Sequence, residues 1–159
     1  MKDIFEVKKL YIIIFIISLL SLLIALYIEF FLNYIPCKLC IYQRIPYLIA
    51  IFLSFLGISY SKNLIWLYGL LLTFFSSFLL SGYHFGIEKE IFKEFSGCTG
   101  NSLNIIDKNE LLKLLNSDVN SCKNVDFQIF GLSLATINFL LSLIIFIIIL
   151  LVIKNEKSK

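Results

Sequence analysis

Residues 10–32 read LYIIIFIISLLSLLIALYIEFFL, and Glu29 is the only charged residue in this block. A helix that crosses a bilayer needs about 20 predominantly apolar residues. Residues 64–83 and 130–153 are blocks of the same kind, and residues 41–60 form a shorter one. The sequence therefore predicts an all-α fold, an integral membrane four-helix bundle with these four blocks as its spans.

The composition of the whole chain supports a membrane protein. Of its 159 residues, 59% are apolar and 16% are charged, whereas soluble domains contain about 45–50% apolar residues. The net charge of +3 is small, and the charged residues form no basic face, so we expect no nucleic-acid partner. The length suits one membrane domain covering residues 1–159.

The predicted spans leave two outer loops, residues 33–40 and 84–129. The longer loop is polar but contains two weakly amphipathic pieces. We expect short helices here, lying either on the protein surface or flat on the membrane. The apolar positions of the first piece are Ile87, Ile91, Phe92 and Phe95, and the second has a capping box of Asp107 and Glu110 before Leu111, Leu112, Leu114 and Leu115.

The Lys and Arg residues give a weak signal for orientation. With both termini on the inner side, the 14 basic residues divide equally between inner and outer segments. The inner ones lie in shorter segments, and basic residues far from a helix end contribute less to orientation. We therefore expect both termini in the cytoplasm.

The four cysteines fall on one side of this topology. Cys37 and Cys40 lie between the first two predicted spans, and Cys98 and Cys122 lie between the last two. With the termini inside, all four face the outer compartment, which in bacteria is the oxidising periplasm. The predicted location is therefore the bacterial inner membrane, crossed several times, with the cysteine loops periplasmic.

Cys37 and Cys40 form a C-x-x-C motif at the start of the second predicted span. The free N–H groups and partial positive charge of a helix N-terminus stabilise a thiolate there. Arg44 follows Cys40 by four residues and shares its helix face. An arginine at a membrane boundary is costly unless it has a partner, and a thiolate or the oxygen of a quinone would supply one.

Residues 36–44 read PCKLCIYQR, and this run resembles the signature of the DsbB family of disulfide-bond-forming membrane proteins. The order of spans and cysteines is also similar to that family, as is the start of the fourth span, FGLSLA at residues 130–135. The resemblance extends over nearly the whole chain. It implies a four-helix bundle, a quinone (ubiquinone or menaquinone), and a periplasmic partner with the thioredoxin fold that resembles DsbA.

The resemblance also implies a role for each cysteine. Cys98 would be the sulfur attacked by the partner's thiolate, and Cys122 would be the leaving sulfur that then exchanges with Cys37. Cys40 would be released as a thiolate facing the quinone, with Arg44 beside it. The chain would then be a protein-dithiol:quinone oxidoreductase that sustains protein disulfide formation.

Two further residues are candidates of lower rank. His84, the single histidine, ends the third predicted span, and family members often have a histidine near this point. It would contact the quinone, or it would be a polar cap on the helix end. Glu29 near the outer end of the first span would be a carboxylate that reaches toward the interface, or a proton acceptor.

Other interpretations of the cysteines remain open. A zinc site would normally repeat the short C-x-x-C spacing, and Cys98 and Cys122 do not, so we expect no metal. Two structural disulfides in a non-enzymatic membrane scaffold are an alternative. So is an enzyme similar to vitamin K epoxide reductase, although its C-x-x-C follows the loop cysteines, whereas here it precedes them.

Overall fold

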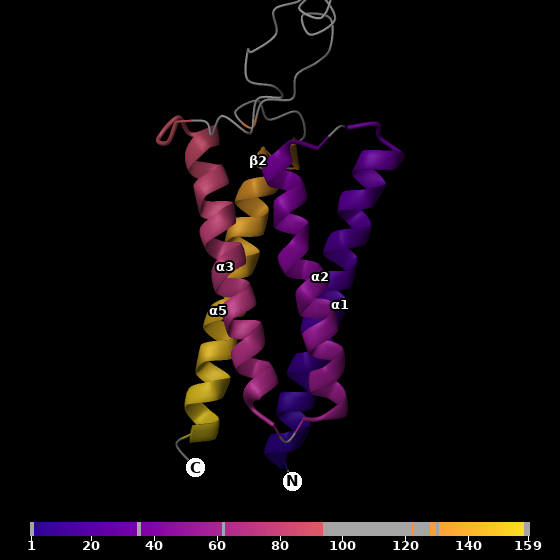
Figure 1. Ribbon diagram of the computed structural model, residues 1–159, viewed down its shortest axis with the longest axis vertical. Coiled ribbons are helices and arrows are strands. Elements are labelled where there is room, and N and C mark those ends of the chain that lie inside the picture. The colour runs from indigo at the N-terminus through magenta and orange to yellow at the C-terminus, as the bar shows by residue number, and fades with distance from the viewer. Residues whose placement is uncertain are drawn as a thin grey trace, which may run out of the picture.

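The computed structural model is a bundle of long helices with both chain termini at one end (Figure 1). The structure describes residues 2–34, 36–61, 63–93, 122, 128–129 and 131–157. Its helices are α1 (Lys2–Phe30), α2 (Lys38–Ser59), α3 (Ile65–Glu88) and α5 (Leu134–Lys157). Two short antiparallel strands, β1 (Gln128–Ile129) and β2 (Leu132–Ser133), precede α5.

Four helices among the described residues are long and apolar enough to cross a membrane, beginning with Val7–Phe30 of α1. Large apolar side chains such as Leu23, Phe52 and Leu72 are exposed on their outer faces, where they suit contact with lipid tails. The predicted all-α, four-span fold is confirmed. The short interfacial helices predicted near residues 107–115 lie outside the described residues.

The hydrophobic core lies where neighbouring helices pack against one another. The largest contacts are those of α3 with α5 and of α1 with α2, followed by α2 with α3, whereas α1 meets α5 over a short stretch. Gly57 permits the close approach of α1 and α2, because a Cβ atom there would lie 2.4 Å from the Tyr11 ring. Buried apolar residues from all four helices complete this core, including Ile14, Ala50, Leu70, Phe74 and Ile149.

Several helix boundaries differ from the predicted spans, and two of these differences affect the cysteine end of the bundle. Helix α3 continues past residue 83 to Glu88, so the residues expected to begin the outer loop are helical. It ends where Glu90 adopts a positive φ of 59° and the Gly86 carbonyl accepts from the backbone N–H groups of Ile91 and Phe92. Helix α5 begins at Leu134 instead of residue 130, after the turn of β1 and β2. The extra turn of α3 brings His84 and Glu88 onto one face at the cysteine end.

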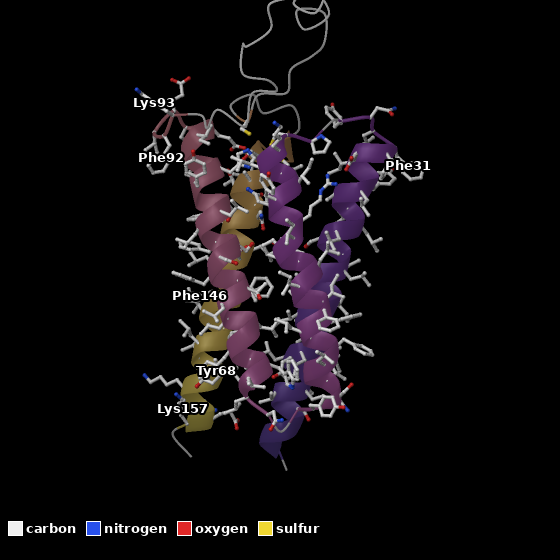
Figure 2. The ribbon with its side chains drawn as sticks, viewed as in Figure 1. Phe31, Tyr68, Phe92, Lys93, Phe146 and Lys157 are labelled. Carbon is white, nitrogen blue, oxygen red and sulfur yellow. The ribbon has the colours of Figure 1, made fainter. Side chains whose placement is uncertain are left out.

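The two ends of the bundle carry different side chains. Figure 2 places Lys157 beside Tyr68 at the end with the termini, and the Lys157 ammonium lies 5.4 Å from the Tyr68 ring centre. Phe92 and Lys93 lie at the opposite end (Figure 2), which is also the end where α2 begins and α3 finishes (Figure 1). The cysteine motif therefore lies at the end of the bundle remote from the termini.

Candidate functional site

Cys37 is the N-cap residue of α2. Its backbone is extended, with φ −65° and ψ 163°, and its sulfur accepts a hydrogen bond from the Cys40 backbone N–H at 3.2 Å. A side chain that accepts from the free amides of the first turn stabilises the helix start, and the amide dipoles favour negative charge on that side chain. The helix N-terminus predicted to act on the C-x-x-C motif therefore acts on Cys37 directly.

Both thiols of this motif are free. The Cys37 and Cys40 sulfurs are in hydrogen-bond contact at 2.7 Å, and the Cys40 thiol is the donor when Cys37 is ionised. Cys37 is buried and Cys40 half-buried, in a small apolar cluster with Leu39 and Ile87. The two sulfurs are close enough for oxidation to join them without moving the helix.

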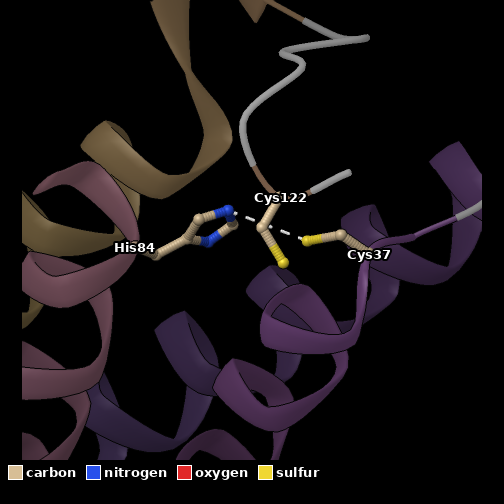
Figure 3. A group of neighbouring side chains, drawn as sticks. All are labelled: Cys37, His84 and Cys122. Atoms are coloured by element: carbon tan, nitrogen blue, oxygen red, sulfur yellow. Dashed lines mark hydrogen bonds between the residues drawn. The ribbon is translucent and has the colours of Figure 1, made fainter. Parts of the chain in front are cut away.

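His84 faces this pair from α3 (Figure 3). Its Nε2 atom lies 3.7 Å from the Cys37 sulfur, and its Nδ1 atom lies 2.9 Å from the Gln43 amide nitrogen. The ring is 3% exposed, and the Glu88 carboxylate one turn along α3 is 3.9 Å from Nε2. His84 is therefore a buried neighbour of the Cys37 sulfur.

Cys122 reaches the same place from the long loop (Figure 3). It is 2% exposed and disulfide-bonded, and since Cys37 and Cys40 are free, neither is its partner. The sulfurs of Cys37 and Cys122 and the nearest His84 ring nitrogen all lie within 4.8 Å of one another. The free Cys37 thiol therefore lies beside a disulfide sulfur. Cys98 lies outside the described residues.

The surroundings of Cys37 favour its thiolate. The hydrogen bond from the Cys40 thiol has the largest effect, and together with the hydrogen bonds of His84 and the Cys40 amide it lowers the pKa of Cys37 to about 5, although burial opposes the shift. Thiolates are the nucleophiles and the better leaving groups of disulfide exchange. Near neutral pH this sulfur is consequently in the form that exchange requires.

The spacing of Cys37, His84 and Cys122 would also suit a metal ion. Zinc binds cysteine as the thiolate, and the Cys122 sulfur is held in a disulfide. In this redox state the cluster has the chemistry of thiol–disulfide exchange.

Arg44 lies one turn after Cys40 on α2, as the sequence spacing indicated, and it makes a contact that the spacing did not indicate. Its guanidinium donates to the Glu29 carboxylate of α1 in a half-buried ion pair. Among the described residues, its hydrogen bond therefore goes to a carboxylate and not to the Cys40 sulfur. Glu29 of α1 therefore has a partner from the neighbouring helix α2.

Sequence reasoning missed several polar residues beneath the cysteines. The Gln43 side-chain oxygen accepts from the Asn138 amide of α5 at 2.9 Å, and Asn138 accepts in turn from Tyr47 and Ser142. A signal was present, because Asn138 is an amide within an otherwise apolar and hydroxyl-bearing span. Polar residues inside membrane helices are costly and often functional.

Comparison with known proteins gives two matches. The family described as disulfide bond formation protein DsbB matches residues 7–152. An uncharacterized protein of Rickettsia prowazekii (strain Madrid E) is 29% identical over 157 residues, which is 95% of this chain and 90% of the relative. The residues matched by the family include the C-x-x-C motif, His84 and Cys122 of this chain.

Proposed function

Because this chain belongs to the DsbB family of disulfide bond formation proteins, we propose that it reoxidises a periplasmic DsbA-like dithiol protein and passes the electrons to a quinone. Family membership makes it a disulfide-bond-forming membrane oxidoreductase, and its helices indicate that the chain crosses the membrane several times. The proposal adds the electron donor, the electron acceptor and the roles of single residues.

One observation carries the proposal, namely the free thiol pair beside the disulfide of Cys122. Two inert structural disulfides would leave no free thiol in this pair. In this arrangement the C-x-x-C pair is reduced, whereas Cys122 of the loop is oxidised to a disulfide. It supports internal exchange between Cys122 and Cys37.

The reaction begins at the loop disulfide. A thiolate of the partner attacks Cys98, a sulfur–sulfur bond to the partner forms, and the electron pair of the broken disulfide goes to Cys122. The Cys122 thiolate then attacks Cys37 of the oxidised C-x-x-C pair, so that a Cys37–Cys122 bond forms and Cys40 leaves as a thiolate. The partner's second thiolate then attacks the partner's own sulfur in the mixed disulfide. This step forms the partner's disulfide and releases Cys98 as a thiolate.

Two further steps complete the cycle. The Cys98 thiolate attacks Cys122, which re-forms the loop disulfide and releases Cys37 as a thiolate. The free thiols of Cys37 and Cys40 and the disulfide-bonded Cys122 are consistent with this state, in which the Cys40 amide and His84 contact the Cys37 sulfur. Loss of two electrons and two protons from Cys37 and Cys40 then joins their sulfurs and restores the starting enzyme.

Arg44 fits the task of holding a quinone oxygen. A guanidinium has five N–H donors, and the ion pair with Glu29 uses a donor on one of its nitrogens, so others remain for a carbonyl oxygen. A bound quinone would supply a two-electron, two-proton acceptor that is soluble in the bilayer. Arg44 and Cys40 are one helical turn apart on α2, so both belong to the same part of the helix.

The redox energetics explain the need for such an acceptor. A DsbA-like protein has a reduction potential of about −120 mV, so its dithiol is a weak reductant and needs a stronger oxidant. A bilayer-soluble quinone requires a membrane enzyme, and a water-soluble partner requires a second cysteine pair outside the bilayer. The bundle and the two pairs meet both requirements.

The proposed orientation follows from the same arrangement. Cys37, Cys40 and Cys122 gather at one end of the bundle, and Lys154 and Lys157 lie in the last turn of α5 at the other. Basic residues next to membrane spans favour the cytoplasmic side. We therefore place both termini in the cytoplasm and the cysteines in the periplasm of a bacterial inner membrane.

The test is quinone reduction by the purified protein with a reduced DsbA-like protein in excess. The absorbance of ubiquinone or menaquinone analogues should fall in the presence of the wild-type protein. It should not fall with Cys37→Ser, and Cys122→Ser should instead accumulate a mixed disulfide between the partner and Cys98. Wild-type protein that leaves both quinones oxidised, while remaining folded, would rule out the proposal in favour of a scaffold.

A further inference from the structure

His84 ends a chain of hydrogen bonds that crosses the bundle beneath the cysteines. Gln43 of α2 contacts the ring at Nδ1, and Asn138 of α5 contacts Gln43, each at 2.9 Å. Ser142 approaches the Asn138 oxygen at 3.3 Å, and Tyr47 also donates to that oxygen. The chain thus links three helices, and the His84 ring and the Gln43 side chain within it are both buried.

The donors and acceptors of this chain run in one direction. Since the hydroxyls of Tyr47 and Ser142 donate to the Asn138 oxygen, the Asn138 nitrogen is left to donate to the Gln43 oxygen. The Gln43 nitrogen, which can only donate, then faces Nδ1 of His84. Nδ1 must therefore accept, and the proton of the neutral ring sits on Nε2, the atom that faces the Cys37 sulfur at 3.7 Å.

This direction matters because the ring's second nitrogen faces a sulfur that carries charge. An Nε2–H group donates to a thiolate, whereas the opposite tautomer would point a lone pair at it. Among the described residues, the other ionisable groups at the site are the Cys40 thiol from α2 and the Glu88 carboxylate from α3, 3.9 Å from Nε2. Glu88 is engaged by the Ser133 hydroxyl.

The polar chain also requires an explanation on energetic grounds. A buried amide without partners in an apolar bundle is strongly unfavourable, and an interhelical hydrogen bond between uncharged groups in a membrane contributes only modest stability. Gln43 and Asn138 are each hydrogen-bonded through both polar atoms. Helix association alone would be met by serine pairs such as Ser77 and Ser142, which contact at 2.9 Å in the same bundle.

We propose that Gln43 and Asn138 are positioning residues that hold the His84 proton on Nε2, directed at Cys37. This inference rests on the proposed function for its purpose, because Cys37 is the leaving sulfur when Cys98 attacks Cys122. The bond that breaks is Cys37–Cys122, and its electron pair goes to the Cys37 sulfur. A donor aimed at that sulfur stabilises the thiolate and speeds its departure.

The first test is the tautomer itself. His84 is the single histidine, so protein labelled with [15N]histidine gives ring signals from one residue. In the reduced C-x-x-C state at neutral pH, Nε2 should have the shift of an N–H nitrogen and Nδ1 that of an unprotonated one. Asn138→Leu lets the Gln43 amide turn over and should give a mixture. The nearly isosteric Asn138→Asp can only accept while ionised, so it should move the proton to Nδ1.

The second test is the reactivity of Cys37 with iodoacetamide, measured as the Cys37 adduct by peptide mass spectrometry. Since the pKa of Cys37 is lowered to about 5, wild-type alkylation should be constant above that pH and fall as pH decreases through it. Loss of the Nε2 donor in Asn138→Leu raises this pKa. Below pH 5 the rate should be about tenfold lower for each unit of increase.

Ser77→Ala is the matched control, because it removes a buried α3–α5 hydrogen bond without touching the amides. It should leave both the tautomer and the alkylation profile at wild-type values. If the two Asn138 variants keep the wild-type tautomer and profile, or if Ser77→Ala changes them equally, the amides only join helices and the inference is wrong. Neither the tautomer measurement nor the alkylation measurement uses quinone or the partner protein. If the proposed function is wrong, quinone reduction will be absent while the expected tautomer and alkylation results are still obtained.

Discussion

At the scale of single residues, the Arg44 guanidinium would have to serve two acceptors, the Glu29 carboxylate and a quinone oxygen. Glu29 accepts from Arg44 across the α1–α2 contact, and a quinone oxygen would need a donor from the same group. The pair is half-buried, so its Coulomb attraction is weaker than in a dry interior. Arg44 can therefore keep its position through Glu29 and use its remaining donors.

We expect substitutions of Arg44 to reduce quinone turnover in a graded way. Arg44→Lys keeps the charge but loses the planar fork of donors, and Arg44→Ala loses both, so alanine should be worse, by about 10- to 100-fold in kcat/KM. The assay is the rate of quinone absorbance decay against quinone concentration. Formation of the partner adduct by Cys98 should be unchanged.

Glu29→Gln is the control for this prediction. It retains the cation and releases the donor that the carboxylate engages, so the apparent quinone affinity should hold or increase. Wild-type rate and affinity in Arg44→Ala would show that Arg44 only anchors α2 to α1.

How far the sequence could predict the site differs from residue to residue. Cys37 and Cys40 were predictable because their motif is local, and Arg44 was placed near them by helical spacing. The Glu29 partner was not, since it depends on which face of α1 meets α2. Gln43 and Asn138 are 95 residues apart, and no local pattern indicates that their amides meet.

At the scale of helices, the contact of α1 with α2 depends on Gly57. A Cβ atom at this position would lie 2.4 Å from the Tyr11 ring, and Tyr11 is fully buried. A ring packed among other core residues cannot move aside cheaply. The boundaries of α3 and α5 were harder to predict, because the end of α3 is fixed by the Gly86 carbonyl and its contacts with residues beyond the apolar block.

Gly57→Ala should destabilise the protein by about 1–3 kcal/mol, the usual cost of overpacking. The measurement is thermal unfolding in detergent, followed by circular dichroism. Gly69→Ala is the comparison, since its Cβ would meet the flexible end of Leu53 at 3.2 Å and that side chain can shift. Equal stability of the two variants would show that α1 can move away from α2 without cost.

At the scale of the whole molecule, the cysteines and the chain termini lie at opposite ends of the bundle. Exposed Lys38 marks the cysteine end, and exposed Asn63 lies in the turn between α2 and α3 at the end with the termini. The sequence could predict that all four cysteines lie at one end. In a chain with four spans, the first and third connections lie on the same side of the membrane, and these two connections contain the cysteines. The sequence could not predict how the helices pack.

Membrane orientation can be tested with cysteines at these two positions. In a chain whose four native cysteines are replaced by serine, Lys38→Cys should react with an impermeant maleimide on spheroplasts with intact membranes. Asn63→Cys should react only after the inner membrane is broken, because it is expected in the cytoplasm. The reverse pattern would place the cysteine site in the reducing compartment and contradict the proposed topology.

In the proposed mechanism, two electrons that enter this chain would be shared among four sulfur atoms. Because the Cys37 and Cys122 sulfurs lie within 4.8 Å of each other, exchange between the pairs would need no large motion, and the half-reduced protein would be a population of two redox isomers. The free thiols of Cys37 and Cys40 correspond to the isomer with the electrons on that pair. An equilibrium redox titration would then return midpoints that belong to the coupled system, as in the titration of two interacting acids. A midpoint for either pair alone would require blocking exchange, for example by replacing Cys122.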